Sequence, residues 1–226
     1  MQKQLTLLAE ETQSDLLKKS KSIGQEWLKA KQKSEMKKLT LFSFLFVGAV
    51  AGRVALQFVP SVEPIIPIAI LAAVILGPKE GFSIGAGAYV ASNFLVWGLQ
   101  GPWTLFQAVG AGVPAVVAGL VLKSNRSEKA FLLAAVLGTV FFEIIMNLFG
   151  SVSNIGLFGL GLLSIPIYFL TSAPFSIAHI VSNLVFARAL SPLLLKLREK
   201  DNELEIIRVR RVDGGRTTDI GLYKPR

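Results

Sequence analysis

Charge is confined almost entirely to the two ends of this 226-residue chain, and the stretch between residues 39 and 187 carries very little. The chain has 52% hydrophobic residues and a mean hydropathy of +0.55, yet its formal net charge is +9. Soluble domains of this length are seldom so apolar. The pattern therefore predicts an integral membrane protein with two charged tails. The absence of cysteine excludes disulfides, thiolate catalysis and Cys-ligated metal sites.

The apolar runs predict an all-α fold with six transmembrane helices, because a helix that crosses the ~30 Å hydrocarbon core needs roughly 20 apolar residues. An interfacial or re-entrant segment, Gly156–Ile165, is expected before the last of them. In order, the predicted spans are Leu39–Val59, Ile65–Gly77, Gly81–Gly98, Thr104–Leu122, Ala130–Phe149 and about Pro166–Leu190. A tight turn near Ser172–Pro174 would instead give seven spans.

The distribution of basic residues favours six spans with both termini cytoplasmic. The expected location is a prokaryotic plasma membrane. With six spans, the tails and the loops PKEG and KSNRSEK fall on one side and hold every Lys and Arg except Arg53. The opposite loops, VPSVEP, LQGPW and SVSNIG, hold none. Cytoplasmic loops carry an excess of Lys and Arg. Seven spans would place the basic residues from Arg188 onward outside.

Polar side chains gather in the outer half of the predicted bundle, around the turn SNFLVWGLQGPWTLFQ (Ser92–Gln107). Polar groups in hydrocarbon are costly unless they face the bundle interior, a partner or water. Their shared depth predicts a solute-binding cavity that opens outward, with no catalytic residue, metal or cofactor. The candidate binding residues are Arg53, Asn93, Trp97, Trp103, Thr104, Gln107, Glu143, Asn147 and His179.

Each candidate also has a structural interpretation that the residues alone leave open. The two tryptophans suit an ordinary interfacial belt, and the two asparagines suit hydrogen bonds across helices. Arg53 and Glu143 suit a buried structural ion pair. His179 suits a packing role with Asn183 as a neighbouring partner.

Small residues recur at four-residue spacing on the first span, as Gly48 and Gly52 and as Ala51 and Ala55. Such ridges let helix backbones approach closely. They suit packing within the chain, and they equally suit docking of a partner membrane subunit.

The tails predict two further parts of the chain on either side of a six-helix membrane domain at residues 39–195. Residues 1–38 suit a basic amphipathic helix on an anionic inner leaflet, where each Lys contributes ~1 kcal/mol. Within residues 196–226, Glu203–Tyr223 alternates and turns at Asp213-Gly214-Gly215, which predicts a β-hairpin. Its arginines are expected to contact lipid headgroups or a protein rather than nucleic acid, since no aromatic stacking platform accompanies them.

Five stretches resemble, in order and spacing, the substrate-binding S components of energy-coupling factor transporters, best the cobalamin-type and related vitamin-type group. They are GPKEGFSIGA (Gly77–Ala86), SNF (Ser92–Phe94), GPWTLFQ (Gly101–Gln107), IIMNLF (Ile144–Phe149) and PFSIAHIVSNLVF (Pro174–Phe186). The resemblance covers roughly Leu39–Leu195. The stretch SIAH (Ser176–His179) lacks the acidic residue that the group often has before this histidine, which weakens a claim for cobalamin.

The resemblance implies a six-helix protein that captures a vitamin-like solute from outside. It also implies docking, through an AxxxA face matched here by Ala51 and Ala55, on a transmembrane coupling subunit driven by two cytoplasmic ATPases. The chain has no phosphate-cradling GxxxxGK[ST] loop, so energy would come from such a partner. A structural or adaptor subunit of a larger membrane complex is the competing hypothesis, and no nucleophile–base pair favours an enzyme.

Overall fold

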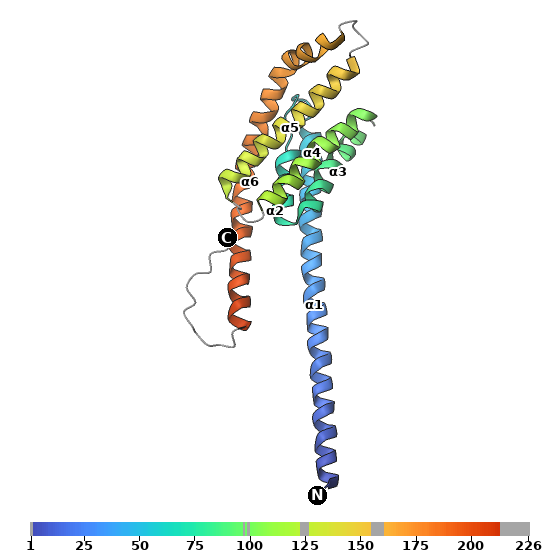
Figure 1. Cartoon of the computed structure of the whole chain (residues 1–226), viewed down its shortest axis with the longest axis vertical. Coiled ribbons are helices and arrows are strands. Elements are labelled where there is room, and N and C mark those ends of the chain that lie inside the picture. The colour runs from blue at the N-terminus through green and yellow to red at the C-terminus, as the bar shows by residue number, and fades with distance from the viewer. Residues whose placement is uncertain (1, 97, 99, 123–126, 155–160, 213–226) are drawn as a thin grey trace. The chain divides into compact units, whose positions relative to one another are not determined.

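The structure, a computed structural model, is all-helical in the residues that it describes (Figure 1). It describes the backbone of residues 2–96, 98, 100–122, 127–154 and 161–212, and the side chains of 25, 27–96, 98, 100–122, 127–153 and 161–196. The elements are α1 (Gln2–Leu56), α2 (Ile65–Ile75), α3 (Pro78–Val96), α4 (Pro102–Val121), α5 (Glu128–Asn154), the short 3-10 helix η1 (Gly161–Leu163) and α6 (Ser164–Val212). The predicted all-α class is confirmed.

Four helical segments are long and apolar enough to cross a membrane. They are Trp27–Leu56, Pro102–Val121, Glu128–Ser153 and Gly161–Lys196. Several such helices in one chain suggest a multi-pass membrane protein. The other two helices meet the criterion less well, since α2 has only 11 residues and α3, with 19, is less apolar.

The chain separates into two compact units, Met1–Ser43 and Phe44–Arg226, and the boundary falls inside α1. In the first unit, the predicted N-terminal helix is present, and its described residues Trp27–Leu39 are exposed. Its placement on a lipid surface stays a prediction. The second unit holds the helical bundle and all the polar residues discussed below.

Helix α2 is the core of the second unit, where it packs against α3, α4, α5 and α6. Every residue from Ile65 to Val74 is buried. A helix that is apolar all round is stable only when other elements cover all its sides. Pro67 lies in the first turn, where its missing N–H has no intrahelical acceptor to lose. Sequence composition therefore places this short helix in the centre of the bundle.

Glycines bring α3 unusually close to its neighbours. A Cβ at Gly81 would lie 2.3 Å from the Cβ of Ala73 on α2, and one at Gly85 would lie 2.9 Å from the carbonyl oxygen of Ala111 on α4. Side-chain-free contacts of this kind allow backbones to pack closely in a membrane. They fix α3, with its polar C-terminal end, against both partners.

Helix α6 differs from the prediction at both of its ends. It runs without a break through Ser172–Pro174, so the alternative of a turn there, and with it a seventh span, is wrong. It also continues to Val212, so the first strand of the predicted hairpin is helical; residues 213–223 lie outside the described part. Of the predicted re-entrant segment Gly156–Ile165, residues 156–160 lie outside the described part, and the rest forms η1 and the start of α6.

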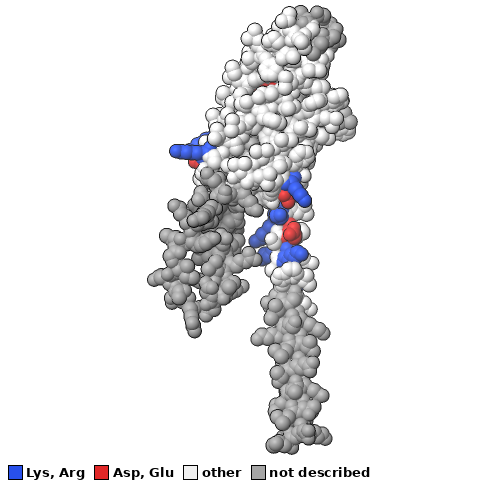
Figure 2. Space-filling model, viewed as in Figure 1, with Lys and Arg blue, Asp and Glu red and all other residues white. Residues whose placement is uncertain are grey.

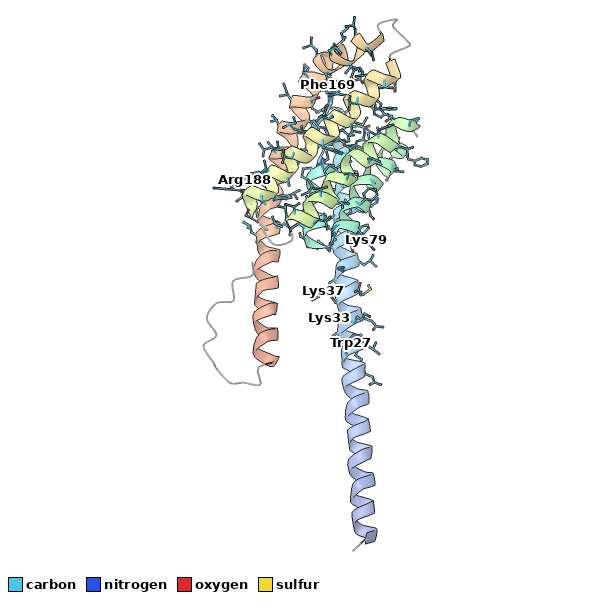
Figure 3. All side chains as sticks on the ribbon, viewed as in Figure 1. Trp27, Lys33, Lys37, Lys79, Phe169 and Arg188 are labelled. Atoms are coloured by element: carbon cyan, nitrogen blue, oxygen red, sulfur yellow. The ribbon has the colours of Figure 1, made fainter. Side chains whose placement is uncertain are left out.

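Charge on the bundle surface is concentrated at one end. Figure 2 shows a face of the second unit that is almost uniformly uncharged, as a lipid-facing surface requires. Lys79 and Arg188 lie toward the same end of this unit, and Phe169 lies toward the other (Figure 3).

Candidate functional site

Arg53 and Glu63 form the charged centre of the site. Arg53 lies one turn before α1 ends at Leu56, and the chain then reverses direction through residues 57–64. Ser61 adopts a left-handed backbone conformation, with a φ of 61°, that non-glycine residues seldom adopt. The reversal returns the Glu63 carboxylate to the guanidinium, with 2.5 Å between Nε and Oε2, and the two side chains are only 14% and 12% exposed.

The Arg53 guanidinium also binds the C-terminal part of α3. Its Nη1 donates to Ser92 Oγ at 2.7 Å and to Asn93 Oδ1 at 2.6 Å. Its Cζ lies 4.9 Å from the centre of the Tyr89 ring, in a cation–π arrangement. A buried guanidinium needs several acceptors to offset its lost hydration, and Glu63 and α3 together supply them.

Asn93 extends the network from α3 to α4. Its Nδ2 donates to Thr104 Oγ1 at 3.0 Å and to Gln107 Oε1 at 2.7 Å. Thr104 Oγ1 also accepts the backbone N–H of Gln100 at 3.3 Å. The side chains of Asn93, Thr104 and Gln107 are all buried. The polar residues of the turn between α3 and α4 thus bind one another and Arg53.

A second polar group joins α5 to α6. Glu143 Oε1 lies 2.6 Å from His179 Nδ1, and its Oε2 accepts a hydrogen bond of 2.5 Å from Ser176 Oγ. Asn147, one turn along α5, donates from Nδ2 to the same Ser176 Oγ at 3.4 Å. Glu143 and Asn147 lie on one helical face because they are four residues apart.

The two groups meet at Glu63 and His179. Glu63 Oε1 accepts a hydrogen bond from the Tyr89 hydroxyl and lies 3.5 Å from His179 Nε2. The ring of Phe142 stacks on Tyr89 and meets His179 edge-on, with 5.2 Å between ring centres in both pairs. The polar side chains of α1, α3, α4, α5 and α6 therefore form one connected cluster inside the bundle, which we call the polar network.

Most of the predicted binding residues belong to the polar network. They are Arg53, Asn93, Thr104, Gln107, Glu143, Asn147 and His179. The sequence left open a structural ion pair between Arg53 and Glu143; in the structure Arg53 instead binds Glu63, and Glu143 binds His179. The suggested pairing of His179 with Asn183 is wrong, because Asn183 Nδ2 donates to Thr139 Oγ1 at 2.9 Å.

Sequence reasoning missed four members of the network: Glu63, Tyr89, Ser92 and Ser176. Glu63 had a signal, since it is the only acidic residue in the loops opposite the basic ones and lies close in sequence to Arg53. Ser92 and Ser176 had a weaker sequence signal, because each lies close in sequence to a predicted site residue, Asn93 or His179. Nothing in the sequence distinguished Tyr89 from an apolar packing residue.

Trp103, one of the two predicted tryptophans, is not among the members of the polar network described above. Trp103 is partly exposed and packs against Phe149, with 5.6 Å between ring centres. Phe149 also stacks on Phe106 at 4.1 Å. The aromatic group of Trp103, Phe106 and Phe149 suits an interfacial role. Trp97 lies outside the described residues.

An open pocket of about 180 Å³ adjoins the network. Arg53 and Glu63 form the charged part of its wall, and the end of α1, the remainder of the α1–α2 connection and the end of α3 form the rest. The other lining residues are Leu56, Gln57, Val59, Pro60, Ser61, Val62 and Val96. The pocket gives a small molecule access to the charged pair from outside the bundle.

The predicted docking residues divide between two faces of α1. Gly48, Ala51 and Ala55 are exposed, and a Cβ at Gly48 would meet nothing within 4 Å. Gly52 faces inward, where a Cβ would lie 2.6 Å from Pro64 Cγ. Gly52 therefore serves packing within the chain, and the other three form an uncovered small-residue face.

Among the described residues, no group of three His, Asp or Glu side chains is arranged to hold a metal ion. The comparisons with known proteins give no family either: no family model, no curated protein and no solved structure matches this chain.

Proposed function

We propose that this chain is the membrane-embedded substrate-capture subunit of an uptake transporter for a vitamin or similar micronutrient. The observation that carries the proposal is a charged pair, Arg53 and Glu63, that is held by a buried polar network and reached through an open pocket. Ionisable groups inside a membrane bundle usually mark a ligand or ion pathway. A concave site with a few converging polar groups is the usual form of a small-molecule site.

The dimensions of the pocket favour a compact solute. Small-molecule pockets commonly measure roughly 300–1,000 Å³, and this one measures about 180 Å³. A corrinoid does not fit it as it stands. Its wall offers guanidinium N–H groups and a carboxylate side by side, so a solute with both an acceptor and a donor, such as a small zwitterion, complements it best.

Energy for uptake comes, in this proposal, from a separate ATPase module, since the chain has no phosphate-cradling loop of its own. The face formed by Gly48, Ala51 and Ala55 is the proposed contact with a transmembrane coupling subunit, as in the S components that the sequence resembles. The proposal includes six spans, with α2 and α3 completing the set, and both termini in the cytoplasm of a prokaryotic cell.

An adaptor role in a larger membrane complex is the second candidate, and the uncovered face of α1 supports it equally. Co-purification of the full chain from its native membrane separates the two. Recovery with ATPases supports transport, whereas recovery with an assembly that lacks an ATPase supports the adaptor.

Direct binding tests solute capture. The full chain in lipid nanodiscs is titrated with a panel of labelled water-soluble vitamins and their small precursors. We expect one of them to bind, and Arg53→Gln to weaken its binding at least ~10-fold, since a lost charge-assisted hydrogen bond is worth roughly 1.5–3 kcal/mol. Val96→Trp, which fills the pocket from the end of α3, should abolish binding without touching the charged pair.

The matched control is Thr171→Val, because this exposed hydroxyl bonds only to carbonyls of its own helix in the described structure. It should bind as the wild type does. No binding across the panel by folded protein, or full binding by Val96→Trp, would refute solute capture at this pocket.

A further inference from the structure

His179 lies between two carboxylates. Its Nδ1 is 2.6 Å from Glu143 Oε1, and its Nε2 is 3.5 Å from Glu63 Oε1. The side chain is 3% exposed, so water does not solvate either ring nitrogen freely. Nε2 has no hydrogen-bond partner among the described residues, although a carboxylate oxygen lies 3.5 Å from it.

The charges that face this ring do not balance. Two carboxylates, Glu63 and Glu143, face it, and the one permanent positive charge that the described residues bring to this cluster is Arg53, which contacts Glu63 and not Glu143. Tyr89, from α3, adds a neutral hydroxyl. The contributions of α4 to the network are a threonine and a glutamine, and the described residues of α2 are apolar. With a neutral imidazole, the buried cluster keeps an excess negative charge, which is costly in a bundle interior.

The hydrogen bonds lead to the same conclusion by a separate route. A neutral His179 that donates from Nδ1 to Glu143 leaves a lone pair on Nε2 facing the Glu63 carboxylate. The other neutral tautomer leaves a lone pair on Nδ1 at 2.6 Å from Glu143. A ring that carries protons on both nitrogens removes both conflicts and supplies the missing positive charge.

We propose that His179 is a proton-binding site, in which a proton on Nε2 bridges to Glu63 while the Nδ1 proton is donated to Glu143. The bound proton joins α5 and α6 to the α1–α2 connection. This assignment follows from the geometry and charge of the cluster and is independent of any solute.

The proton site has a consequence for the pocket. Glu63 ends the segment Gln57–Glu63 that forms most of the pocket wall. The described contacts between this segment and α6 are the Glu63–His179 contact and the hydrogen bond of 3.2 Å from Ser182 Oγ to Ser61 O. Loss of the proton makes the Glu63–His179 contact repulsive, so the segment becomes more mobile and the pocket widens. This step rests on the proposed solute site, and it makes solute binding proton-linked.

The chain has a single histidine, so labelled-histidine NMR reports on this site alone. The full chain with ¹⁵N-histidine, in nanodiscs at about pH 7, should give two N–H type ring resonances. In Glu63→Gln, which removes the charge that the proton balances, Nε2 should shift to a pyridine-type resonance at the same pH. The control Thr171→Val should match the wild type. A pyridine-type Nε2 in the wild type overturns the proposal, and two N–H type resonances in Glu63→Gln overturn the assignment of Glu63 as the partner.

The effect on the pocket wall is tested separately. The chain has no cysteine, so Val59→Cys accepts a single spin label on the wall. Label mobility should increase as the pH is raised through the change seen by NMR, and it should not respond to pH when His179→Gln is added. Mobility that ignores the proton overturns the coupling and leaves the proton site standing. Neither measurement uses a solute, so failure to find one bears only on solute capture.

Discussion

Replacing Arg53 with Gln should destabilise the fold by about 3–5 kcal/mol, because it leaves a buried carboxylate without its ion-pair partner. Glu63 is 12% exposed and loses a contact of 2.5 Å. The change also removes the donor to Ser92 Oγ at 2.7 Å and to Asn93 Oδ1 at 2.6 Å. The Tyr89 hydroxyl still donates to Glu63, and the proposed proton on His179 still faces it, which keeps the loss near the lower end of that range.

The measurement is the free energy of unfolding of the full chain in mixed micelles, titrated with SDS and followed by tryptophan fluorescence. The double variant with Glu63→Gln should cost less than the sum of the two single variants by about 2 kcal/mol, because neutral amides then replace both charges. Pairing Arg53→Gln with Glu143→Gln should give a smaller coupling, since Glu143 binds His179 instead.

Two results would refute this account of the charged pair. One is a loss below about 1 kcal/mol for Arg53→Gln, which would place the pair in the range of exposed ion pairs. The other is a stronger coupling of Arg53 to Glu143 than to Glu63, which would restore the pairing that the sequence suggested.

Three further predictions use the same unfolding assay. Gly81→Ala should destabilise the fold by about 1–3 kcal/mol through overpacking, since its Cβ would lie 2.3 Å from the Cβ of Ala73. Gly48→Ala, with open space around it, should be neutral or stabilise the fold by up to about 1 kcal/mol. Equal effects of the two variants would contradict the close packing at Gly81. Thr139→Val should destabilise the fold by about 1–3 kcal/mol, because Asn183 Nδ2 then loses the hydroxyl to which it donates, and Asn183 Oδ1 already has no described partner. A neutral result would show that Asn183 Nδ2 finds another acceptor. Arg188→Ala should cost no more than about 1 kcal/mol, because its ion pair is 67% exposed on the arginine side; a larger loss would indicate burial by a partner.

The helices were predictable because their signal is local. Apolar runs and charge segregation define where a chain can be helical in a membrane, and α4 and α5 fall within a few residues of the predicted spans. The β-hairpin prediction was wrong in its first strand because the alternation in Glu203–Val212 is a weak signal. The helix that precedes this stretch continues through it to Val212.

The sequence predicted part of the membership of the candidate site, and it did not predict which of these residues pair. Depth along each helix follows from the sequence at 1.5 Å per residue, so Arg53, Asn93 and Glu143 could be placed at a similar level and His179 nearer the middle. Which groups meet depends on how each helix is rotated and on where connecting segments lead. The left-handed turn at Ser61 directs Glu63 to Arg53, and no periodicity predicts that.

The sequence by itself determined that this chain is helical, apolar in its middle and polar at one depth, because composition and spacing act along one helix at a time. Tertiary structure decided the partners. It buried the short helix α2 at the centre, closed α3 against it through glycine contacts, and brought Glu63 and Glu143 to the two sides of His179. These outcomes depend on contacts between residues distant in sequence, where packing and the cost of burying charge select one arrangement among many.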